Sequence, residues 1–599
     1  MRYTAPVKDM LFVLNELARL PEIAAKPRFA EATPDLVGAI LEEAARFAND
    51  VIAPLNQPAD QQPGRYAEGQ VQTALGFKAA FNQYAEAGWQ SITHPTEYGG
   101  QGLPQLVGAA CGEMFNAASL SFALCPMLTN GTIEALLATG SPELRERYIP
   151  ALLQGRWTGT MNLTEPAAGS DLALLRSRAQ PADNGTYRLY GTKIFITYGE
   201  HDFAENIVHL VLARLPDAPA GVKGISLFLV PKFLVNADGS LGARNDVHCV
   251  SIEHKLGIKA SPTCTLQFGD HGGAIGYLVG EPHRGLAAMF IMMNAARFAV
   301  GIQGVALAER AYQQALAYAQ ERVQSRPVDG SSGHAIAIIG HPDVQRMLAT
   351  MCCSAQASRA LAYYTAGTAD LASTDSDEEN RRVYTAEYEF LIPIVKGWST
   401  ELAIEATSLG VQVHGGMGFI EETGAAQHYR DARILTIYEG TTAIQANDLL
   451  GRKTLRDGGA TARRLLAHIE TTESELQAHA ADAAQAMLPS LTQARQALGR
   501  AIDTLVEQAP ARPQAAHGVA VPYLMLSGTV LGGWQMARTL LAALRLYDQD
   551  PEFHDRKIAM ALFYARHRLV AANGLAATIE SDLRQDAADV LTVTHFAHD

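Results

Sequence analysis

The spacing of apolar residues changes twice along this chain of 599 residues. Up to about residue 150 they recur every three or four positions, which is typical of the buried face of a helix. Between Trp157 and Pro282 they form short runs rich in β-branched and aromatic residues, and helical spacing then returns. The order predicts helices, a small antiparallel β-domain and helices again. The predicted strands include 187–190, 193–197, 207–212, 225–230 and 263–268.

A single hydrophobic core seldom spans this many residues, so we expect several domains. Thr33 followed by Pro34 predicts the start of a helix that ends at Pro54. We predict a mostly α fold with four domains: N-terminal helical over 1–156, central β over 157–282, a helical bundle over 283–453 and an extra C-terminal helical domain over 454–599. The helices expected in the last domain are 461–488, 493–507, 522–547 and 553–583.

The charge and cysteine content exclude several classes of function. The net charge is −14 and no basic patch stands out, so we expect no binding to nucleic acid. The six cysteines show no spacing typical of a zinc site, so we predict no metal and reduced thiols, as in a cytoplasmic protein. The stretch 518–536 is uncharged and long enough to cross a bilayer, but its proline, serine and glycines favour a buried helix over an integral membrane span.

Common signatures of phosphate binding and hydrolysis are absent. The chain has no GxGxxG that opens a βαβ unit, no GxxxxGK[ST], no HExxH and no GxSxG. Nicotinamide-binding, nucleotide-hydrolysing, zinc-peptidase and α/β-hydrolase functions are therefore not indicated.

Two segments near the β-domain carry polar groups suited to a flat ligand. In 161–171 a hydroxyl, a proline bend and a Gly-Ser-Asp turn lie close together, and in 193–199 Phe195 and Thr197 are expected on one face of a strand. An aromatic ring beside a hydroxyl can stack on a heterocycle and bond its edge. Each segment is also compatible with an ordinary turn or an amphipathic strand.

Two further segments lie in the bundle. The glycines of 412–419 let a ligand approach the backbone, although they also end helices, and His414 in that segment is expected to be structural. Glu439 lies between Tyr438 and Gly440, just after an apolar run. A buried carboxylate there would have a raised pKa suited to removing a proton, whereas an exposed one would simply cap the next helix.

Taken together and in this order, the four segments resemble the acyl-CoA dehydrogenase family over about residues 35–453. The length and the N-terminal sequence resemble the long bacterial branch of that family. The resemblance implies an α/β/α three-domain fold, FAD as cofactor, an acyl-CoA substrate, electron-transfer flavoprotein as electron acceptor and a homodimer. It leaves the acyl group open between a fatty acyl chain and 3-(methylthio)propanoyl.

The resemblance also implies a role for each residue that matches a family motif. Glu439 would be the catalytic base. The residues implied in cofactor binding are Met161, Leu163, Thr164, Ser170, Phe195, Thr197, Arg322, Gln412, Gly416 and Thr441. The residues implied in substrate binding are Ser170, Arg297, Tyr438 and Gly440.

The implied reaction forms a trans-2-enoyl-CoA. Glu439 would take the α-proton of the thioester while the β-hydride moves to flavin N5, with hydrogen bonds to the thioester carbonyl stabilising the developing enolate. Three alternatives on the same fold remain open: an acyl-CoA oxidase that uses oxygen, a non-catalytic assembly protein and a nitroalkane-oxidising enzyme. The glutamate at 439 argues against the last two, because a non-catalytic protein needs no base and nitroalkane oxidation is associated with aspartate.

Overall fold

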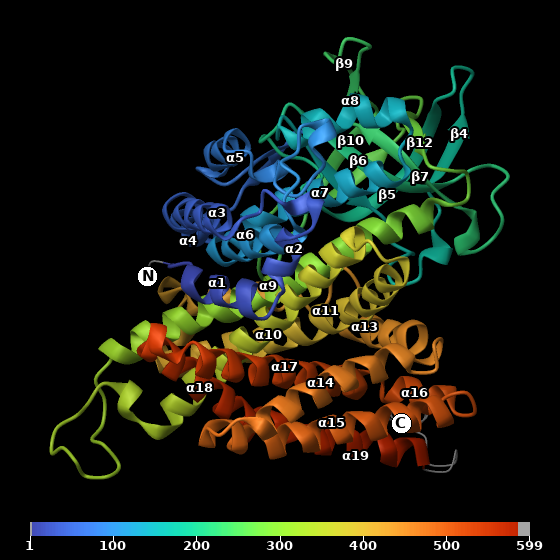
Figure 1. Ribbon diagram of the computed structural model, residues 1–599. Coiled ribbons are helices and arrows are strands. Elements are labelled where there is room, and N and C mark those ends of the chain that lie inside the picture. Colours follow the sequence, from blue (N-terminus) through green and yellow to red (C-terminus); the bar gives the residue numbers. More distant parts are fainter. Residues whose placement is uncertain (1–2, 585–599) are drawn as a thin grey trace, which may run out of the picture. The chain divides into compact units, whose positions relative to one another are not determined.

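The computed structural model describes residues 3–584, which fold into two compact units (Figure 1). Of the described residues, unit 1 comprises 3–7, 27–306 and 426–434. Unit 2 comprises 8–26, 307–425 and 435–584. The chain therefore passes repeatedly from one unit to the other.

The first helices of unit 1 begin as the sequence predicts. Thr33 caps the first of them by accepting a hydrogen bond from the Leu36 N–H at 3.3 Å. The predicted end at Pro54 is wrong, because the helical backbone continues from the first helix through a π-helical turn over Ala48–Ile52 into the following helix, which contains Pro54 in its first turn. These helices are α3 (Pro34–Phe47), α4 (Ala53–Gln61), α5 (Phe77–Glu86), α6 (Gln105–Ala118), α7 (Leu120–Thr139) and α8 (Pro142–Leu153).

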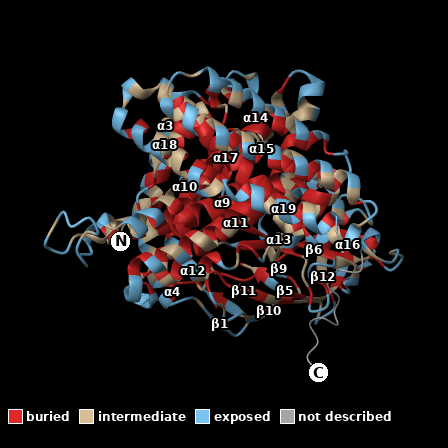
Figure 2. Ribbon diagram, turned by 90° about the horizontal axis from the view of Figure 1, so that it is seen from below, coloured by how far each residue is buried: buried red, intermediate tan, exposed pale blue. Residues whose placement is uncertain are grey.

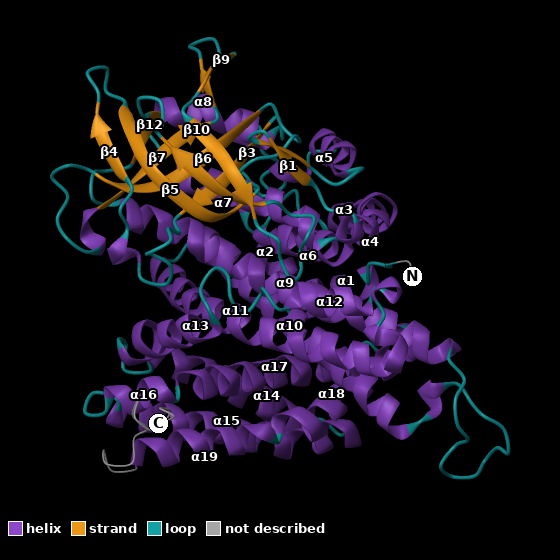
Figure 3. Cartoon of the chain, turned by 180° about the vertical axis from the view of Figure 1, so that it is seen from behind, coloured by secondary structure: helices purple, strands orange, loops and turns teal. Residues whose placement is uncertain are grey.

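An eight-stranded sheet forms the centre of unit 1, and its strands are orange in Figure 3. Its order is β10-β11-β5-β12-β7-β6-β3, with β4 paired to β5 and β6. Two small hairpins, β1–β2 and β8–β9, lie apart from it. The strands are β1 (Arg65–Ala67), β2 (Gln70–Gln72), β3 (Trp157–Asn162), β4 (Arg178–Pro181), β5 (Tyr187–Thr197), β6 (Asn206–Arg214), β7 (Ile225–Pro231), β8 (Phe233–Val235), β9 (Leu241–Arg244), β10 (Val247–Ile252), β11 (Thr263–Phe268) and β12 (Ala274–Val279).

The sheet is antiparallel at most of its pairings, and two parallel pairings depart from the sequence prediction. One is the short contact of β4 with β6, where Arg178 lies opposite Arg214. Strands β3 and β6 are parallel, with Trp157 opposite Asn206. A parallel pair needs a long crossover, and residues 163–205, which include the β4–β5 hairpin, provide it. Most residues of helix α7 are buried, and the helix packs against β3.

Unit 2 is helical. Helix α9 (Gly285–Glu321) enters it from unit 1 and is followed by the antiparallel pair α10 (Pro342–Thr374) and α11 (Glu378–His414). Short α12 (Ala425–Ala432) belongs almost wholly to unit 1, and α13 (Thr442–Asp448) returns to unit 2. The C-terminal helices are α14 (Ala460–Ala478), α15 (Asp482–Gln508), α16 (Pro513–Gly518), α17 (Ala520–Arg545), α18 (Pro551–Tyr564) and α19 (Ala571–Arg584).

The predicted helix 461–488 is divided differently. Helix α14 ends at Ala478 and α15 runs through Pro489. The Gln485 side chain donates to the carbonyls of Leu476 at 3.1 Å and His479 at 2.9 Å, which satisfies the end of α14. Helix α14 thus ends ten residues earlier than predicted.

The uncharged stretch 518–536 is a buried helix, as predicted. Most of α17 is buried, and its residues are red in Figure 2. A Cβ added at Gly528 would lie 2.2 Å from the Trp398 ring, and one at Gly532 would lie 2.4 Å from it. Glycines at these positions therefore allow α17 to pack directly on the indole of α11.

By length and composition alone, two helices of the described residues are able to cross a membrane, α7 and α9. In the structure 78% of the tested α7 window is buried inside the protein, and 50% of the α9 window.

The N-terminal helix α1 (Val7–Glu16) is fixed within unit 2 by buried ion pairs. The Asp9 carboxylate accepts from Arg359 Nη1 at 2.7 Å and contacts the Lys557 ammonium, and Arg359 Nη2 donates to Glu309 at 2.9 Å. Burial lowers the pKa of Lys557 to about 7. Residues near both ends of the described chain therefore share one ionic cluster.

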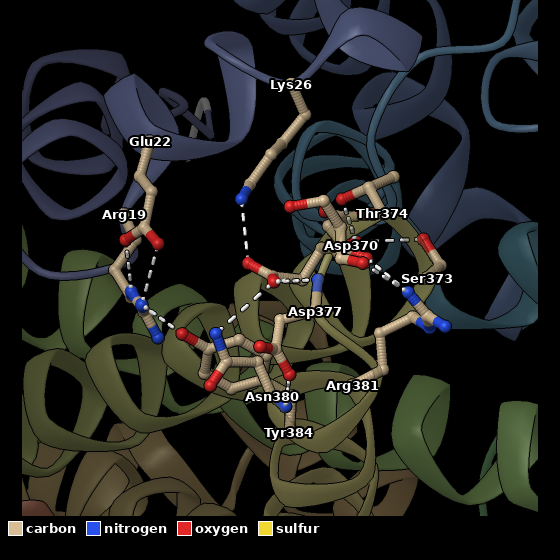
Figure 4. A network of polar contacts seen from close by, with 12 residues as sticks. Arg19, Glu22, Lys26, Asp370, Ser373, Thr374, Asp377, Asn380, Arg381 and Tyr384 are labelled. Atoms are coloured by element: carbon tan, nitrogen blue, oxygen red, sulfur yellow. Dashed lines mark hydrogen bonds and ion pairs between the residues drawn. The ribbon is translucent and has the colours of Figure 1, made fainter.

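A second polar network joins α2 (Leu20–Ala24) and its flanks to the α10–α11 turn (Figure 4). Lys26 Nζ donates to Asp375 Oδ2 at 2.8 Å, and Arg19 Nη2 donates to the Tyr384 hydroxyl at 3.0 Å. Together with the Asp9 cluster, these bonds attach the N-terminal segment to the long helices of unit 2.

Candidate active site

In unit 1, the loop after β3 is held against β5 by a buried ion pair. Lys193 Nζ lies 2.8 Å from Glu165 Oε1 and also donates to the Leu163 carbonyl at 3.1 Å. The Glu165 carboxylate accepts from the backbone N–H groups of Arg176 at 2.7 Å and Ser177 at 3.1 Å. These bonds fix the position of the loop that is predicted to lie beside the flavin. Neither Glu165 nor Lys193 was predicted as a site residue from the sequence.

Burial acts in opposite directions on the two members of this pair. Burial lowers the pKa of Lys193 to about 8, against the opposing effect of Glu165. Burial alone would raise the pKa of Glu165, but Lys193 and the hydrogen bonds outweigh it, so that the pKa lies below its ordinary value. Glu165 is therefore an ionised structural anchor at neutral pH.

A β-bulge displays Phe195 at the surface of unit 1. Between β5 and β11, Ile196 pairs with Cys264 and Lys193 with Leu266, so one residue of β11 faces two of β5. Phe195 has φ of 60° and its ring is 59% exposed. Exposed Phe195 and half-buried Thr197 flank buried Ile196.

Most of the predicted flavin-side residues come together around this strand. The Ile194 N–H donates to the Thr164 carbonyl at 2.9 Å, which brings the Thr164 loop beside β5. Met161 is buried at the end of β3, Leu163 and Thr164 are half-buried, and Ser170 is exposed in the following turn. Arg297 is buried within the part of α9 that belongs to unit 1.

In unit 2, Glu439 lies in the loop between α12 and α13 with φ of 54°. A non-glycine residue in this region carries about 1–3 kcal/mol of strain, and such residues persist where their surroundings hold them. Gln445 Nε2 donates to the carbonyls of Glu439 at 3.1 Å and Gly440 at 3.2 Å. Lys396, fully buried on α11, donates to the Gly440 carbonyl at 2.6 Å.

Glu439 is not the N-cap residue of α13. Thr441 is the N-cap of α13, and its side chain accepts from the Ile444 N–H at 3.3 Å. Thr442 Oγ1 donates to Glu401 at 2.6 Å. The half-buried side chains of Tyr438 and Glu439 are thus presented by a loop whose backbone is bonded on both sides.

Arg322, Gln412 and Gly416 are exposed at neighbouring helix ends of unit 2. Tyr318, one turn before Arg322, stacks on His414 with ring centroids 4.4 Å apart. His414 Nδ1 also bonds the Gly410 carbonyl at 2.7 Å, and burial lowers the pKa of His414. His414 is therefore structural, as the sequence suggested, and it brings the ends of α9 and α11 together.

Lys396 and Gln445 were not predicted from the sequence. One available signal for Lys396 was a single cation inside the otherwise apolar segment 390–398 of a helix. Such a buried lysine needs a partner. Nothing in the sequence indicated that this partner is a carbonyl 44 residues away.

The side chains at these positions fit the FAD expected from the sequence. In unit 1 an exposed aromatic ring and nearby hydroxyl groups suit a flat heterocycle with polar edges. In unit 2 a Cβ added at Gly415 or Gly416 would meet nothing within 4 Å, which leaves open backbone beside the exposed Arg322 helix end. Backbone N–H groups and arginine are the usual partners of a diphosphate.

Comparison with known sequences covers nearly the whole chain. Three profiles match in order: "Acyl-CoA dehydrogenase, N-terminal domain" over 37–156, its middle domain over 160–271 and its C-terminal domain over 283–454. A fourth, "Acetyl-CoA dehydrogenase C-terminal like", matches 465–587.

Among curated relatives, 3-methylmercaptopropionyl-CoA dehydrogenase of Ruegeria pomeroyi is 54% identical over 95% of this chain and 96% of the relative. Butyryl-CoA dehydrogenase of Syntrophomonas wolfei is 34% identical over 94% of each chain. The solved acyl-CoA dehydrogenase of Bacillus anthracis, complexed with FAD, shares the fold with a TM-score of 0.74, 23% identity, and coverage of 93% of this chain and 90% of that one. On these matches, the chain belongs to the acyl-CoA dehydrogenase family, whose members are FAD-dependent oxidoreductases.

Proposed function

We propose that this enzyme desaturates an acyl-CoA thioester between Cα and Cβ, with Glu439 as the base. The Glu439 carboxylate accepts the α-proton, and the Glu439 backbone N–H donates to the thioester carbonyl as negative charge develops there. The product is the trans-2-enoyl-CoA. A carboxylate in water is too weak a base for this proton, so the donor to the carbonyl is essential.

One observation carries the proposal. Glu439 is held with positive φ in a loop whose carbonyls are bonded by Gln445 and by the buried Lys396. Strain that several neighbours maintain is characteristic of functional positions. The neighbouring Tyr438 and Gly440 are proposed to contact the substrate, together with Ser170 and Arg297.

The residues proposed to hold FAD fall into two sets. Around the ring system these are Met161, Leu163, Thr164, Ser170, Phe195, Thr197 and Thr441, and around the diphosphate and adenosine they are Arg322, Gln412 and Gly416 of a second copy. The chemistry that FAD supplies when bound is the uptake of the β-hydride as a two-electron oxidant. The protein orients the thioester, holds the α-proton on Glu439 and excludes water.

For the acyl group we propose 3-(methylthio)propanoyl-CoA as the preferred substrate. The support is the 54% identity, over nearly the full length, to an enzyme named for that substrate. More distant relatives are named for butyryl-CoA and for a broad range of linear acyl-CoAs. We further propose electron-transfer flavoprotein as the electron acceptor and a homodimer as the active form.

The proposal is tested by giving a panel of acyl-CoA substrates to the holoenzyme in the absence of oxygen. The bleaching of the flavin absorbance measures the reaction with each substrate. The panel contains 3-(methylthio)propanoyl-, butyryl- and octanoyl-CoA, and the first is expected to give the highest kcat/KM. Reoxidation is then followed with electron-transfer flavoprotein and, separately, with oxygen.

Rapid peroxide formation without reduction of electron-transfer flavoprotein would identify an oxidase instead. If the protein takes up no FAD and none of the thioesters bleaches a flavin absorbance, the protein is a non-catalytic relative. A preference for butyryl- or octanoyl-CoA would reject the proposed acyl group alone.

A further inference from the structure

Three side chains at one corner of the β-domain carry metal-binding atoms that converge. Asp246 lies just before edge strand β10, His248 lies in that strand, and His271 lies in the turn between β11 and β12. One ligand atom from each lies within 4.8 Å of the others. We propose that these three residues form a binding site for a late first-row divalent cation, with Zn²⁺ as the best match.

His271 Nδ1 is within hydrogen-bonding distance of Asp246 Oδ1, and the separations of both imidazoles from this oxygen also match those between the ligands of one metal ion. His248 Nε2 and His271 Nδ1 each lie 3.3 Å from Asp246 Oδ1. Ligand atoms about 2.0–2.2 Å from a tetrahedral zinc are separated by about 3.3–3.5 Å. A charge-assisted N–H···O bond to a carboxylate is shorter, at about 2.7–2.9 Å.

The carboxylate is oriented before any ion arrives. Asp246 Oδ2 accepts from the backbone N–H of His271 at 2.7 Å and from that of Gly273 at 3.1 Å. These bonds direct Oδ1 toward the two imidazoles. Hydrogen bonds from neighbouring groups to a residue that binds a metal typically change the metal affinity about 10–100-fold.

The turn that carries His271 has a backbone suited to this arrangement. Gly272 and Gly273 have φ of 110° and 101°, and a Cβ at Gly273 would lie 2.7 Å from Arg188 Cβ. Two imidazoles and one carboxylate are the donor set of many three-ligand zinc sites, with water in the fourth position. Hard cations such as Mg²⁺ prefer oxygen ligands only, so the set selects against them.

The sequence predicted no metal because this site has no familiar spacing. His248 and His271 are 23 positions apart and come together only through the β10–β11 pairing and the turn after it. The proposed ion would join an edge strand to the adjacent turn within unit 1. It takes no part in the reaction proposed for Glu439, so the two proposals stand or fall separately.

The test is direct titration of tag-free holoenzyme with Zn²⁺ in competition with a chromophoric chelator. One equivalent per chain is expected, and Asp246→Asn, His248→Gln and His271→Asn should each weaken binding about tenfold or more. His334→Gln, an exposed histidine of unit 2, is the control and should bind as the wild type. The cobalt-substituted protein should show the intense visible absorption of a tetrahedral site.

The same variants report on folding. Zn²⁺ should raise the thermal unfolding temperature of the wild type and of His334→Gln but not of His271→Asn, and Mg²⁺ should raise neither. Equal zinc affinity in the wild type, Asp246→Asn and His248→Gln overturns the proposal, as does a weakly absorbing cobalt form.

Discussion

Lys396 Nζ donates to the Gly440 carbonyl oxygen over 2.6 Å from a fully buried position on α11. This bond and those of Gln445 hold the backbone that presents Glu439. The conformation of the proposed base therefore depends on a residue 43 positions before it. Lys396 is a positioning residue, because it bonds the loop and not the reacting atoms.

Replacing Lys396 by Met is expected to lower kcat about tenfold to hundredfold. The change removes the shorter of the two hydrogen bonds to the Gly440 carbonyl and leaves that from Gln445 at 3.2 Å, which costs about 1–3 kcal/mol in the positioning of the loop. Steady-state kinetics with flavin content measured in parallel checks this. Lys78→Met, at an exposed position of α5, is the control. If kcat fell only in proportion to the loss of bound FAD or of folded protein, a positioning role for Lys396 would be contradicted.

Glu439→Gln is expected to keep FAD bound and to lower the rate of flavin reduction by at least about a hundredfold, the usual contribution of a general base. Glutamine preserves the side-chain volume and leaves the backbone donors in place. Stopped-flow reduction by substrate measures the rate, and Glu507→Gln, on the exposed face of α15, is the control. Substantial turnover by Glu439→Gln would place the base elsewhere.

Asp431→Asn is expected to stabilise the protein above neutral pH. Burial raises the pKa of Asp431 to about 7, although its Oδ1 accepts from the Ile258 N–H at 2.5 Å. Between the ordinary pKa of 3.8 and that value, the folded state binds a proton that the unfolded state has lost. The contribution of Asp431 to the free energy of unfolding therefore falls as the pH rises from 3.8 to about 7, and it stays low above that pH.

Asparagine keeps the acceptor oxygen for Ile258 and removes the titration. The gain in the free energy of unfolding should grow from about pH 4 to about pH 7 and reach on the order of 1–3 kcal/mol above it. Urea unfolding at several pH values gives the slope. Asp217→Asn, where the side chain is 81% exposed, should leave the slope unchanged. If the free energy of unfolding changed with pH in the same way in the wild type and in Asp431→Asn, the raised pKa would not belong to Asp431.

Gly528→Ala is expected to destabilise unit 2. Its Cβ would lie 2.2 Å from the Trp398 ring, so α17 or the indole must move, at a cost of about 1–3 kcal/mol. Gly574→Ala is the matched control, because a Cβ there meets nothing within 4 Å on exposed α19 and alanine favours the helix by about 0.5–1 kcal/mol. Thermal unfolding should move in opposite directions for the two variants. A shift of the same sign would refute the packing argument.

Phe419→Asp is expected to weaken the proposed homodimer. Phe419 is 86% exposed, and Met417 and Ile420 beside it are about half exposed, close in sequence to the proposed Gly416 contact. A charge there should lower both the mass in solution and the FAD content, since Arg322, Gln412 and Gly416 are proposed to serve the partner's cofactor. Light scattering measures the mass, with Leu75→Asp, at a 93% exposed site of unit 1, as the control. A monomeric wild type would reject the dimer.

The order of helical and β segments was predictable because each element has its own apolar period. Strand β11 begins where the sequence placed it. One prediction failed at a proline, because Pro54 lies in the first turn of α4 and does not end the preceding helix. A proline in or near the first turns of a helix breaks few hydrogen bonds, and the sequence does not say where the first turn is.

The site was predictable in its residue types but not in its geometry. The motif identified Glu439, yet its positive φ follows from bonds made by Lys396 on another helix. Likewise the Phe195 bulge depends on the register between β5 and β11. These features come from pairings between distant segments, which local periodicity does not encode.

The distribution of the chain between the two units limits how the protein can be divided. The backbone passes from one unit to the other after residues 7, 26, 306, 425 and 434, and the visit to unit 1 at 426–434 is only nine residues long. No single cut yields a fragment that contains one whole unit and nothing of the other. Separately expressed halves, circular permutants and split-protein reporters must therefore keep all five crossings between the units intact. The short segment 426–434 ends five residues before Glu439.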